Sequence, residues 1–458
     1  MAIATLNPTT GVVETTFTPH TPAEVEAILD RAHRANAVMR ATAFAQRAEW
    51  MHRAADLMVA DLEHLAALAA TEMGKTVGTA TYEVTKSANG MRHYADNAER
   101  YLADETPVEA SAVGASAARV IFQPIGTVLA VMPWNYPFWQ VIRFAAPALM
   151  AGNTGLLKHA SSVPQVALYL GELFERAGFP VGAFQTLLIE GAAASKLIDD
   201  RRIAAVTLTG SVGAGAAVAE AAGRNIKKSV LELGGTDVFV VTPSADIARS
   251  AEFGANSRTQ NSGQSCICAK RFYVHEDVYD EWFAAFLERM RAMVPGDPFD
   301  PATSFGPMAT ESVRAEAHEL VEDAKAKGVT VHVGGELPSG PGWFYPATVL
   351  TGVTPEMRIF REECFGPVAC VYKVSSLDEA IALSNDSEFG LAASVWSADP
   401  VEIERLQREL EFGAVFANGN TASFFGLPFG GVKDSGYGRE LGVFGIREFV
   451  NAKTVWTA

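Results

Sequence analysis

The sequence has 458 residues, 48% of them hydrophobic and 20% charged, and this length allows two or three domains with substantial cores. A formal net charge of −16 argues against nucleic acid as a partner, because the field of the protein repels polyanions. Four cysteines, no signal-peptide pattern and no apolar run of membrane-spanning length predict a soluble cytoplasmic protein without a disulfide framework.

Residues 22–105 are rich in Ala, Glu, Arg and Met, and their apolar residues recur at helical spacing, which predicts several long helices. From about residue 118, short apolar runs bounded by Gly and Pro alternate with helical segments, and a second such block starts near "KSVLELGG". Strands that alternate with helices indicate βαβ units and parallel sheets. The sequence therefore predicts an α/β protein with two α/β blocks and a helical N-terminal cover.

Two stretches have only part of a phosphate-binding pattern. "MGKT" at Met73–Thr76 needs a Gly five positions before Gly74, but that position is Ala69, and no predicted strand precedes it. "GSVGAG", which begins at Gly210, follows an apolar strand but does not match G-x-G-x-x-G. Its glycines fit either a strand–turn–helix phosphate site or an ordinary turn.

The stretch "NSGQSCICAKRF" places Cys266 and Cys268 one residue apart. Structural zinc sites space paired cysteines by two to four residues and need a second pair, and Cys364 and Cys370 are too widely separated to form one, so no metal site is expected. Cys364 and Cys370 are interpreted as buried packing residues. Cys266 has Gly, Ser, Asn and Gln around it and little to pack against, which makes it a candidate nucleophile.

Three other stretches form an ordered set with "GQSC": "PWNYPFWQ" with Asn135 after a strand, "LELGG" with Glu232 at a strand end, and "EECFGP" with Glu363 and Phe365. Together they resemble the aldehyde dehydrogenase superfamily in motif, in order and in the spacing from Glu232 to Cys266. The resemblance covers essentially the whole chain. Each motif alone has modest specificity, whereas the ordered set is highly specific.

The resemblance implies a catalytic role for three of these residues. The Cys266 thiolate would attack an aldehyde to give a thiohemiacetal, and loss of hydride would leave a thioester. The Asn135 amide and the Cys266 backbone N–H would stabilise the oxyanion, and Glu232 would activate the hydrolytic water. Taken alone, Asn135 could equally be a turn residue and Glu232 a surface or ion-paired carboxylate.

The resemblance also implies a site for NADP or NAD. Lys158 in "LLKHAS" matches a lysine that binds the adenosine ribose, and Ser161 stands where NAD-preferring members often carry Glu. Without that carboxylate a 2′-phosphate is not repelled, so NADP should be accepted, although Ser161 could also be a helix N-cap. The other cofactor-binding residues that the resemblance implies are Trp134, Gly210, Ser211, Glu363 and Phe365.

Within the superfamily, the motifs look like those of the shorter bacterial succinate-semialdehyde dehydrogenases. The resemblance implies that Arg143 anchors the distal carboxylate of the substrate and that Ser423 assists, since an arginine binds a carboxylate through two parallel hydrogen bonds. Arg143 could alternatively form a structural ion pair. Thr236–Asp237–Val238 departs from the Ser-Asp-Pro of related enzymes, and Gln260 and Asn261 replace an Arg found near the nucleophile elsewhere. Another semialdehyde, or an aliphatic or aromatic aldehyde, therefore remains open as the substrate.

The implied architecture is an aldehyde dehydrogenase fold with a Rossmann-like NAD(P)-binding domain at 1–105 and 125–232 and an α/β catalytic domain at 233–434. A small β element at 106–124 and 435–458 would extend the sheet of a partner copy in a homodimer or homotetramer. The other expected partner is the small-molecule aldehyde, without nucleic acid or membrane.

Two rival functions and one redox role complete the sequence-based hypotheses. An acylating dehydrogenase would not rely on Glu232, and a non-catalytic nucleotide-binding protein of the same fold would be expected to lack Cys266, Glu232 or Asn135. Cys268 is either a packed thiol or a redox partner that resolves a sulfenic acid on Cys266 as a strained disulfide.

Overall fold

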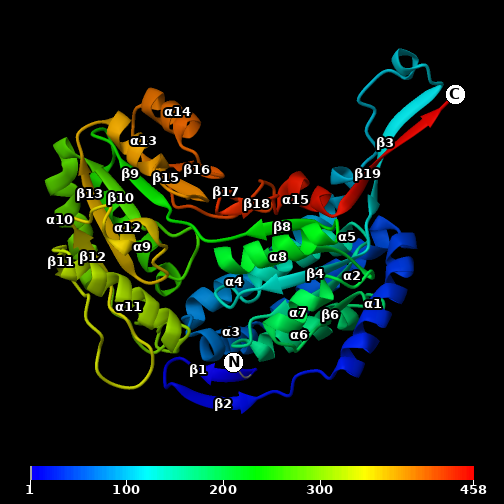
Figure 1. The fold of residues 1–458 in the computed structure, drawn as a ribbon, viewed down its shortest axis with the longest axis horizontal. Coiled ribbons are helices and arrows are strands. Elements are labelled where there is room, and N and C mark those ends of the chain that lie inside the picture. The colour runs from blue at the N-terminus through cyan, green and yellow to red at the C-terminus, as the bar shows by residue number, and fades with distance from the viewer. Residues whose placement is uncertain (1–2) are drawn as a thin grey trace.

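The computed structural model describes residues 3–458. Two α/β bodies lie side by side, and a two-stranded ribbon projects from one of them (Figure 1). Both bodies are built on largely parallel sheets, which confirms the predicted α/β fold class. Within the described residues, no helix combines the length and the apolar character needed to cross a membrane.

The first body contains a six-stranded sheet in the order β18-β8-β7-β4-β5-β6, in which only β18 is antiparallel to its neighbour. Strands β4 and β5 are buried along almost their whole length, as expected of a parallel sheet covered on both faces. The elements are β4 (Thr127–Met132), α5 (Trp139–Met150), β5 (Thr154–His159), α6 (Pro164–Arg176), β6 (Phe184–Thr186), α7 (Gly191–Leu197), β7 (Ile203–Thr209), α8 (Val212–Arg224), β8 (Lys228–Glu232) and β18 (Gly436–Tyr437).

The long helices predicted in the N-terminal region are present, and they pack against this first body (Figure 1). A hairpin of β1 (Ala4–Asn7) and β2 (Val12–Thr16) precedes α1 (Pro22–Ala41), α2 (Phe44–Ala60), α3 (Leu62–Met73) and α4 (Val77–Tyr101). Helix α4 packs along both α2 and α5, and the three share one apolar core. This packing brings the polar side chains of α4 next to those of α5.

The second body contains a seven-stranded sheet in the order β11-β12-β13-β10-β9-β15-β16, with an aromatic core around Phe239, Phe272 and Trp282. Its elements are β9 (Val238–Val241), α9 (Ile247–Thr259), the 3₁₀ turn η2 (Gln260–Gly263), β10 (Arg271–His275), α10 (Glu276–Ala292), α11 (Glu311–Ala326), β11 (Thr330–Val333), β12 (Thr348–Thr351), α12 (Arg358–Arg361), β13 (Val368–Val374), α13 (Leu377–Asn385), β15 (Ala392–Trp396), α14 (Pro400–Glu409) and β16 (Ala414–Ala417). A short pair of β14 (Phe389–Gly390) and β17 (Val432–Lys433) leads back to the first body.

The projecting ribbon pairs β3 (Ala117–Pro124) with β19 (Val450–Thr457) antiparallel along their full length, close to a 3₁₀ turn, η1 (Ala110–Val113). No further strand of the described chain joins this pair. Residues 436–448, which the predicted division assigned to the oligomerisation element, contribute β18 to the first sheet and α15 (Gly442–Glu448) against α4 and α5. Only 450–457 therefore extends into the ribbon.

Candidate active site

Cys266 lies on the loop between α9 and β10, directly after η2. Asn261, Ser262 and Gly263 all have positive φ, at 51°, 60° and 74°. This conformation is unfavourable for Asn and Ser, so the surrounding structure must hold the turn in place. The turn reverses the chain and brings Cys266 to the junction of the two bodies.

Two cavities meet at Cys266. The helix cavity, of about 300 Å³, is lined by α4 and α5 side chains that include Lys86 and Arg143, together with Ser423. The strand-end cavity, of about 310 Å³, lies at the carboxyl ends of β4, β7 and β8. Cys266 and Gln140 line both cavities.

Cys266 is half-buried, and the loss of hydration at its thiol raises the pKa to about 12. Arg143 and Lys270 lower the pKa, while Glu363 and Asp237 raise it. The thiol is therefore protonated at neutral pH in this state. Attack on a carbonyl requires a base or a change in the surrounding charges to produce the reactive thiolate.

Arg143 is 3% exposed and forms an ion pair with Glu440. Its Nη2 donates to Thr209 Oγ1 at 3.2 Å, and its guanidinium carbon lies 4.9 Å from the ring centroid of Phe429. The ion-pair alternative considered for Arg143 is thus present in the structure. The side chain also lines the helix cavity, as the substrate-anchor hypothesis requires.

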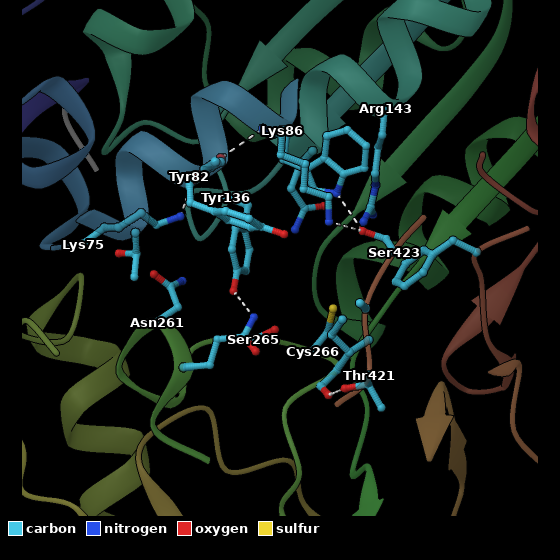
Figure 2. Close-up of a pocket in the computed structure, with 18 residues that line it drawn as sticks. Lys75, Tyr82, Lys86, Tyr136, Arg143, Asn261, Ser265, Cys266, Thr421 and Ser423 are labelled. Atoms are coloured by element: carbon cyan, nitrogen blue, oxygen red, sulfur yellow. Dashed lines mark hydrogen bonds and ion pairs between the residues drawn. The ribbon is translucent and has the colours of Figure 1, made fainter. Parts of the chain in front are cut away.

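Lys86 on α4 is a second cation in the helix cavity, and the sequence analysis did not identify it. Its Nζ donates to Ser423 Oγ at 2.9 Å and lies 4.6 Å from the ring centroid of Trp139 (Figure 2). The indole Nε1 of Trp139 donates to the same Ser423 oxygen at 3.0 Å. Sequence position gave no signal for Lys86, because a lysine on a helix usually faces solvent.

Glu83 fixes the start of α5. One carboxylate oxygen accepts hydrogen bonds from the N–H groups of Phe138 and Trp139, both at 2.9 Å, and the other pairs with the buried Lys75. Lys75 is the lysine of "MGKT", and Gly74 ends α3 in the left-handed conformation at φ 78°. This lysine is therefore a structural cation, in agreement with the rejection of a phosphate loop.

Asn135 follows β4 and is 4% exposed. Its side-chain oxygen accepts from Gln140 Nε2 at 3.0 Å, and its Nδ2 donates to the Gln264 carbonyl at 3.1 Å. The Nδ2 group carries a second hydrogen, for which residues 3–458 provide no acceptor, and the same holds for the Cys266 backbone N–H. Two free donors therefore remain near the nucleophile.

Glu232 ends β8 with a side chain that is 2% exposed. Burial raises the pKa of its carboxyl group well above the usual value, and the nearby Glu440 adds to this rise, while Arg143 and Arg439 oppose it. Neither carboxylate oxygen has a hydrogen-bond partner within residues 3–458. Glu232 lines neither cavity, so its side chain would have to turn to reach a water at Cys266.

Five of the predicted cofactor residues lie together in the strand-end cavity: Trp134, Gly210, Ser211, Glu363 and Phe365. The rings of Trp134 and Phe365 meet edge to face with centroids 5.7 Å apart. Ser211 is the N-cap of α8, and its Oγ accepts from the Ala214 N–H at 3.3 Å. The N-terminus of a helix at a strand end provides free N–H groups and a positive dipole end for an anion such as pyrophosphate.

Lys270, another residue that the sequence analysis missed, forms a 3.0 Å ion pair with Glu363. Its Nζ also donates to the carbonyls of Cys266 at 2.7 Å and Ser265 at 3.2 Å. Burial lowers the pKa of Lys270, but Glu363, Cys268 and Asp237 together oppose burial and leave the pKa raised. Lys270 therefore stays charged and holds the backbone of the nucleophile loop.

Lys158 and Ser161 do not line the strand-end cavity. Lys158 lies near the end of β5, and Ser161 borders a separate small cavity. The N-cap interpretation of Ser161 is wrong, because α6 begins after Val163 and the buried carboxylate of Glu72 accepts from two N–H groups of its first turn. A cofactor would have to extend beyond the strand-end cavity to reach Lys158.

Cys268 is 1% exposed and lines neither cavity. Its sulfur donates to the Ser265 carbonyl at 2.8 Å and accepts from Arg258 at 3.1 Å. Arg258 also donates to the carbonyls of Gly263 and Ala269, so it ties both ends of the nucleophile loop together. Cys266 and Cys268 are both free thiols here.

Comparisons of the sequence and the structure with those of known proteins identify the family of the chain. A sequence profile described as "Aldehyde dehydrogenase family" matches residues 1–455. The chain belongs to the aldehyde dehydrogenase family. This dehydrogenase is 66% identical, over 100% of both chains, to a protein of Paenarthrobacter nicotinovorans named "Aldehyde dehydrogenase". It is 53% identical to the "Succinate-semialdehyde dehydrogenase [NADP(+)]" of Mycobacterium avium (strain 104), over 100% of this chain and 97% of the relative.

Among solved structures, the dehydrogenase matches the succinic semialdehyde dehydrogenase of Streptococcus pyogenes in complex with NADP+. The TM-score is 0.96 at 36% sequence identity, over 99% of each chain. The family resemblance and the aldehyde dehydrogenase fold implied by the sequence are therefore confirmed, and the chain is an enzyme.

Proposed function

We propose that this enzyme oxidises an aldehyde to a carboxylate with NADP or NAD, and that the aldehyde is succinate semialdehyde. The observation that carries the proposal is the position of Cys266, which lines both the helix cavity and the strand-end cavity. A substrate can approach this nucleophile from one side and a cofactor from the other. Aldehyde oxidation needs this arrangement, because the carbon bonded to sulfur must also lose a hydride.

In the first step, Cys266 Sγ adds to the aldehyde carbon and a tetrahedral oxyanion forms. The free Nδ2 hydrogen of Asn135 and the Cys266 backbone N–H are the donors proposed to stabilise this oxyanion. Gln140 holds the Asn135 oxygen and so orients the amide. Lys270, bonded to the Cys266 carbonyl, fixes the backbone from which the sulfur attacks.

Loss of hydride from the tetrahedral carbon to a bound cofactor would leave a thioester on Cys266. In the second step, water attacks this thioester, Glu232 accepts a proton of the water, and the carboxylate and the Cys266 sulfur are released. The raised pKa of Glu232 makes this carboxylate a stronger base than an exposed glutamate. Its two oxygens have no hydrogen-bond partner within residues 3–458, so no hydrogen bond would have to break for the side chain to turn. We therefore propose that Glu232 turns from Glu440 toward Cys266 during hydrolysis.

The residues of the strand-end cavity fit a nicotinamide dinucleotide. Ser211 and Gly210 would face the pyrophosphate at the start of α8, and Glu363, Trp134 and Phe365 would surround the nicotinamide half next to Cys266. When bound there, the cofactor supplies the hydride acceptor.

The preference proposed is for NADP, although NAD should also be accepted. Lys158 forms no ion pair within the described residues, and Ser161 adds no negative charge near it. A free lysine suits a 2′-phosphate, because a charge-assisted hydrogen bond would then form without competition.

Succinate semialdehyde is proposed because the helix cavity offers cations for a distal carboxylate. Arg143 and Ser423 line this cavity together with Cys266. The relative from Mycobacterium avium and the structure from Streptococcus pyogenes both bear the name of this activity. Another acidic semialdehyde is the second candidate. Related enzymes carry an arginine near the nucleophile, whereas Gln260 and Asn261 line the cavity at that point in this chain.

The geometry disfavours the rival functions. Transfer of the thioester to coenzyme A would not need Glu232, which is placed at the end of β8 with a raised pKa. A non-catalytic protein would have no reason to keep Cys266 open to two cavities.

The test is a steady-state assay of cofactor reduction with succinate semialdehyde and, for comparison, butanal, each with NADP and with NAD. We expect the highest kcat/KM with succinate semialdehyde and NADP. A preference for butanal would overturn the proposed substrate but not the dehydrogenase activity. Cofactor binding without reduction by any short aldehyde would overturn the activity.

We also propose that the ribbon of β3 and β19 pairs with a second copy of this chain. Strand β19 leaves its outer edge without a strand partner in the described chain, whereas the outer edge of β3 is bridged at Val120 by Glu105. Such open edges are normally covered. Light scattering of the intact chain and of a variant lacking 450–458 tests this proposal. The intact chain should be a dimer or a larger oligomer, and equal masses per particle in both would contradict it.

A further inference from the structure

Three cations, Lys75, Lys86 and Arg143, line the helix cavity, and their charges are used differently. Arg143 is already paired with a carboxylate, because its Nε lies beside Glu440, and its Nη2 donates one hydrogen to Thr209 Oγ1. Lys86 forms no ion pair with any carboxylate of residues 3–458, and Glu83, three residues earlier on α4, pairs with Lys75 instead. The positive charge that remains uncompensated in this cavity is therefore that of Lys86.

The contacts of Ser423 point in the same direction. A serine hydroxyl has two lone pairs and one hydrogen. Both lone pairs accept hydrogen bonds, one from Lys86 Nζ at 2.9 Å and one from Trp139 Nε1 at 3.0 Å. The hydroxyl hydrogen has no acceptor within the described residues, although Ser423 lines the cavity. Lys86 likewise uses one of its three ammonium hydrogens on Ser423, so the pair presents unused donors on one side of the cavity (Figure 2).

We propose that Lys86, together with the Ser423 hydroxyl, binds the distal carboxylate of the substrate and selects aldehydes that carry a negative charge, with Arg143 in an auxiliary role. The inference rests on the proposed function, since it names the side chain that recognises the carboxyl end of the same substrate. Trp139 packs against the ammonium group and keeps it on the cavity side. The carboxylate would accept from Lys86 Nζ and Ser423 Oγ, both of which lie on the same cavity wall as Arg143.

Burial lowers the pKa of Lys86 to about 8, with a further lowering from Arg143 on α5 and an opposing effect of Glu83 on α4. The other titratable groups that line this cavity are Lys75, Tyr82, Tyr136 and Cys266. Lys86 is charged below pH 8 and becomes neutral above it. The advantage of an anionic aldehyde should therefore shrink as the pH rises through about 8.

The decisive measurement is the ratio of kcat/KM for succinate semialdehyde to kcat/KM for butanal, a neutral aldehyde of the same carbon number. We expect Lys86→Met to lower this ratio by about tenfold to a hundredfold, because one charge-assisted contact of that strength is lost. Lys86→Arg should restore much of the ratio, and Ser423→Ala should lower it less than Lys86→Met. Unchanged affinity for NADP shows that each variant is folded, and Lys373→Met, a change at an exposed lysine of β13, is the matched control.

In the wild type, the same ratio should fall above pH 8, whereas in Lys86→Met it should be independent of pH across that range. A ratio that Lys86→Met leaves unchanged would overturn the inference and leave the proposed function intact. A wild type that does not prefer succinate semialdehyde over butanal would overturn the proposed substrate, and the role of Lys86 with it.

Discussion

The two cavities that meet at Cys266 are built in different ways. The strand-end cavity is formed by the turns that follow β4, β7 and β8, with Gly210, Ser211 and Gly234 among its lining residues. The helix cavity is formed by long side chains of α4 and α5, above all Lys86, Trp139 and Arg143. The first follows from the topology of a parallel sheet, whose strand ends and helix N-termini form ligand sites, whereas the second depends on individual side chains. Under the proposed function, the fold would account for the cofactor site, and a few helix residues would account for the choice of aldehyde.

Cys266 lines both cavities, so its removal should abolish the reaction while both cavities keep their capacity to bind substrate and cofactor. We expect Cys266→Ala to lower turnover by at least about 10⁴-fold, because no other side chain can form the covalent intermediate. Binding of NADP, followed by the quenching of tryptophan fluorescence or by calorimetry, should be unchanged. Measurable oxidation by the alanine variant would remove Cys266 from the role of nucleophile.

Glu232 lies outside both cavities, so its substitution should affect hydrolysis and leave both binding steps intact. Glu232→Gln should slow steady-state turnover by about 10²- to 10⁴-fold, the usual contribution of a general base. In stopped-flow experiments, a rapid first turnover that produces reduced cofactor should persist, because hydride transfer precedes hydrolysis.

The same carboxylate predicts a pH dependence. Because the pKa of Glu232 is raised, wild-type turnover should fall as the pH drops through that raised value, where the base becomes protonated. Glu232→Gln should lose this dependence. A variant with full steady-state turnover would show that another group activates the water.

Arg143 lines the helix cavity and also forms an ion pair with the buried Glu440, so its loss should destabilise the protein. Arg143→Met leaves Glu440 buried without a partner, a change that typically costs about 3–5 kcal/mol. Chemical denaturation measures this loss, and the double change Arg143→Met with Glu440→Gln should recover much of it. Turnover of succinate semialdehyde and of butanal should decline together, because Arg143 also lowers the pKa of Glu232. A selective loss with succinate semialdehyde alone would make Arg143, and not Lys86, the main anchor.

On the cofactor side, Ser161→Glu should change nucleotide preference without changing the choice of aldehyde. The new carboxylate would repel a 2′-phosphate and compete for Lys158, so kcat/KM with NADP should fall by about tenfold to a hundredfold. Activity with NAD should change little, and Ser161→Gln serves as the neutral control. Equal effects on NADP and NAD would place the 2′-phosphate elsewhere.

The sequence predicted most of the strand-end cavity and little of the helix cavity, for a physical reason. Residues at strand ends occur in short motifs with Gly and Pro, so Trp134, Asn135 and Ser211 could be identified in order along the chain. Lys86 comes into the cavity only because α4 packs on α5, and a contact between distant helices leaves no local pattern. Gln140 did lie within the quoted motif "PWNYPFWQ", and attention to every polar residue of that motif would have found it.

The same limit explains the errors at α6 and at the C-terminal segment. The stretch "SSVPQ" is typical of a helix capped by serine. The first N–H groups of α6 instead donate to the carboxylate of Glu72, which is far away in sequence. The boundary at 435 was placed too early because β18 is two residues long and is recognisable only by its pairing with β8.

The meeting of two cavities at one sulfur has a consequence for inhibitor chemistry. An electrophile with a short carboxylate tail could enter the helix cavity, place its acid group on Lys86 and alkylate Cys266 while the nucleotide remains bound. A neutral electrophile of the same reactivity would lack that anchor and should label the enzyme more slowly. If Lys86 anchors a carboxylate, the selectivity of covalent labelling at this cysteine should depend on the charge at the far end of the reagent.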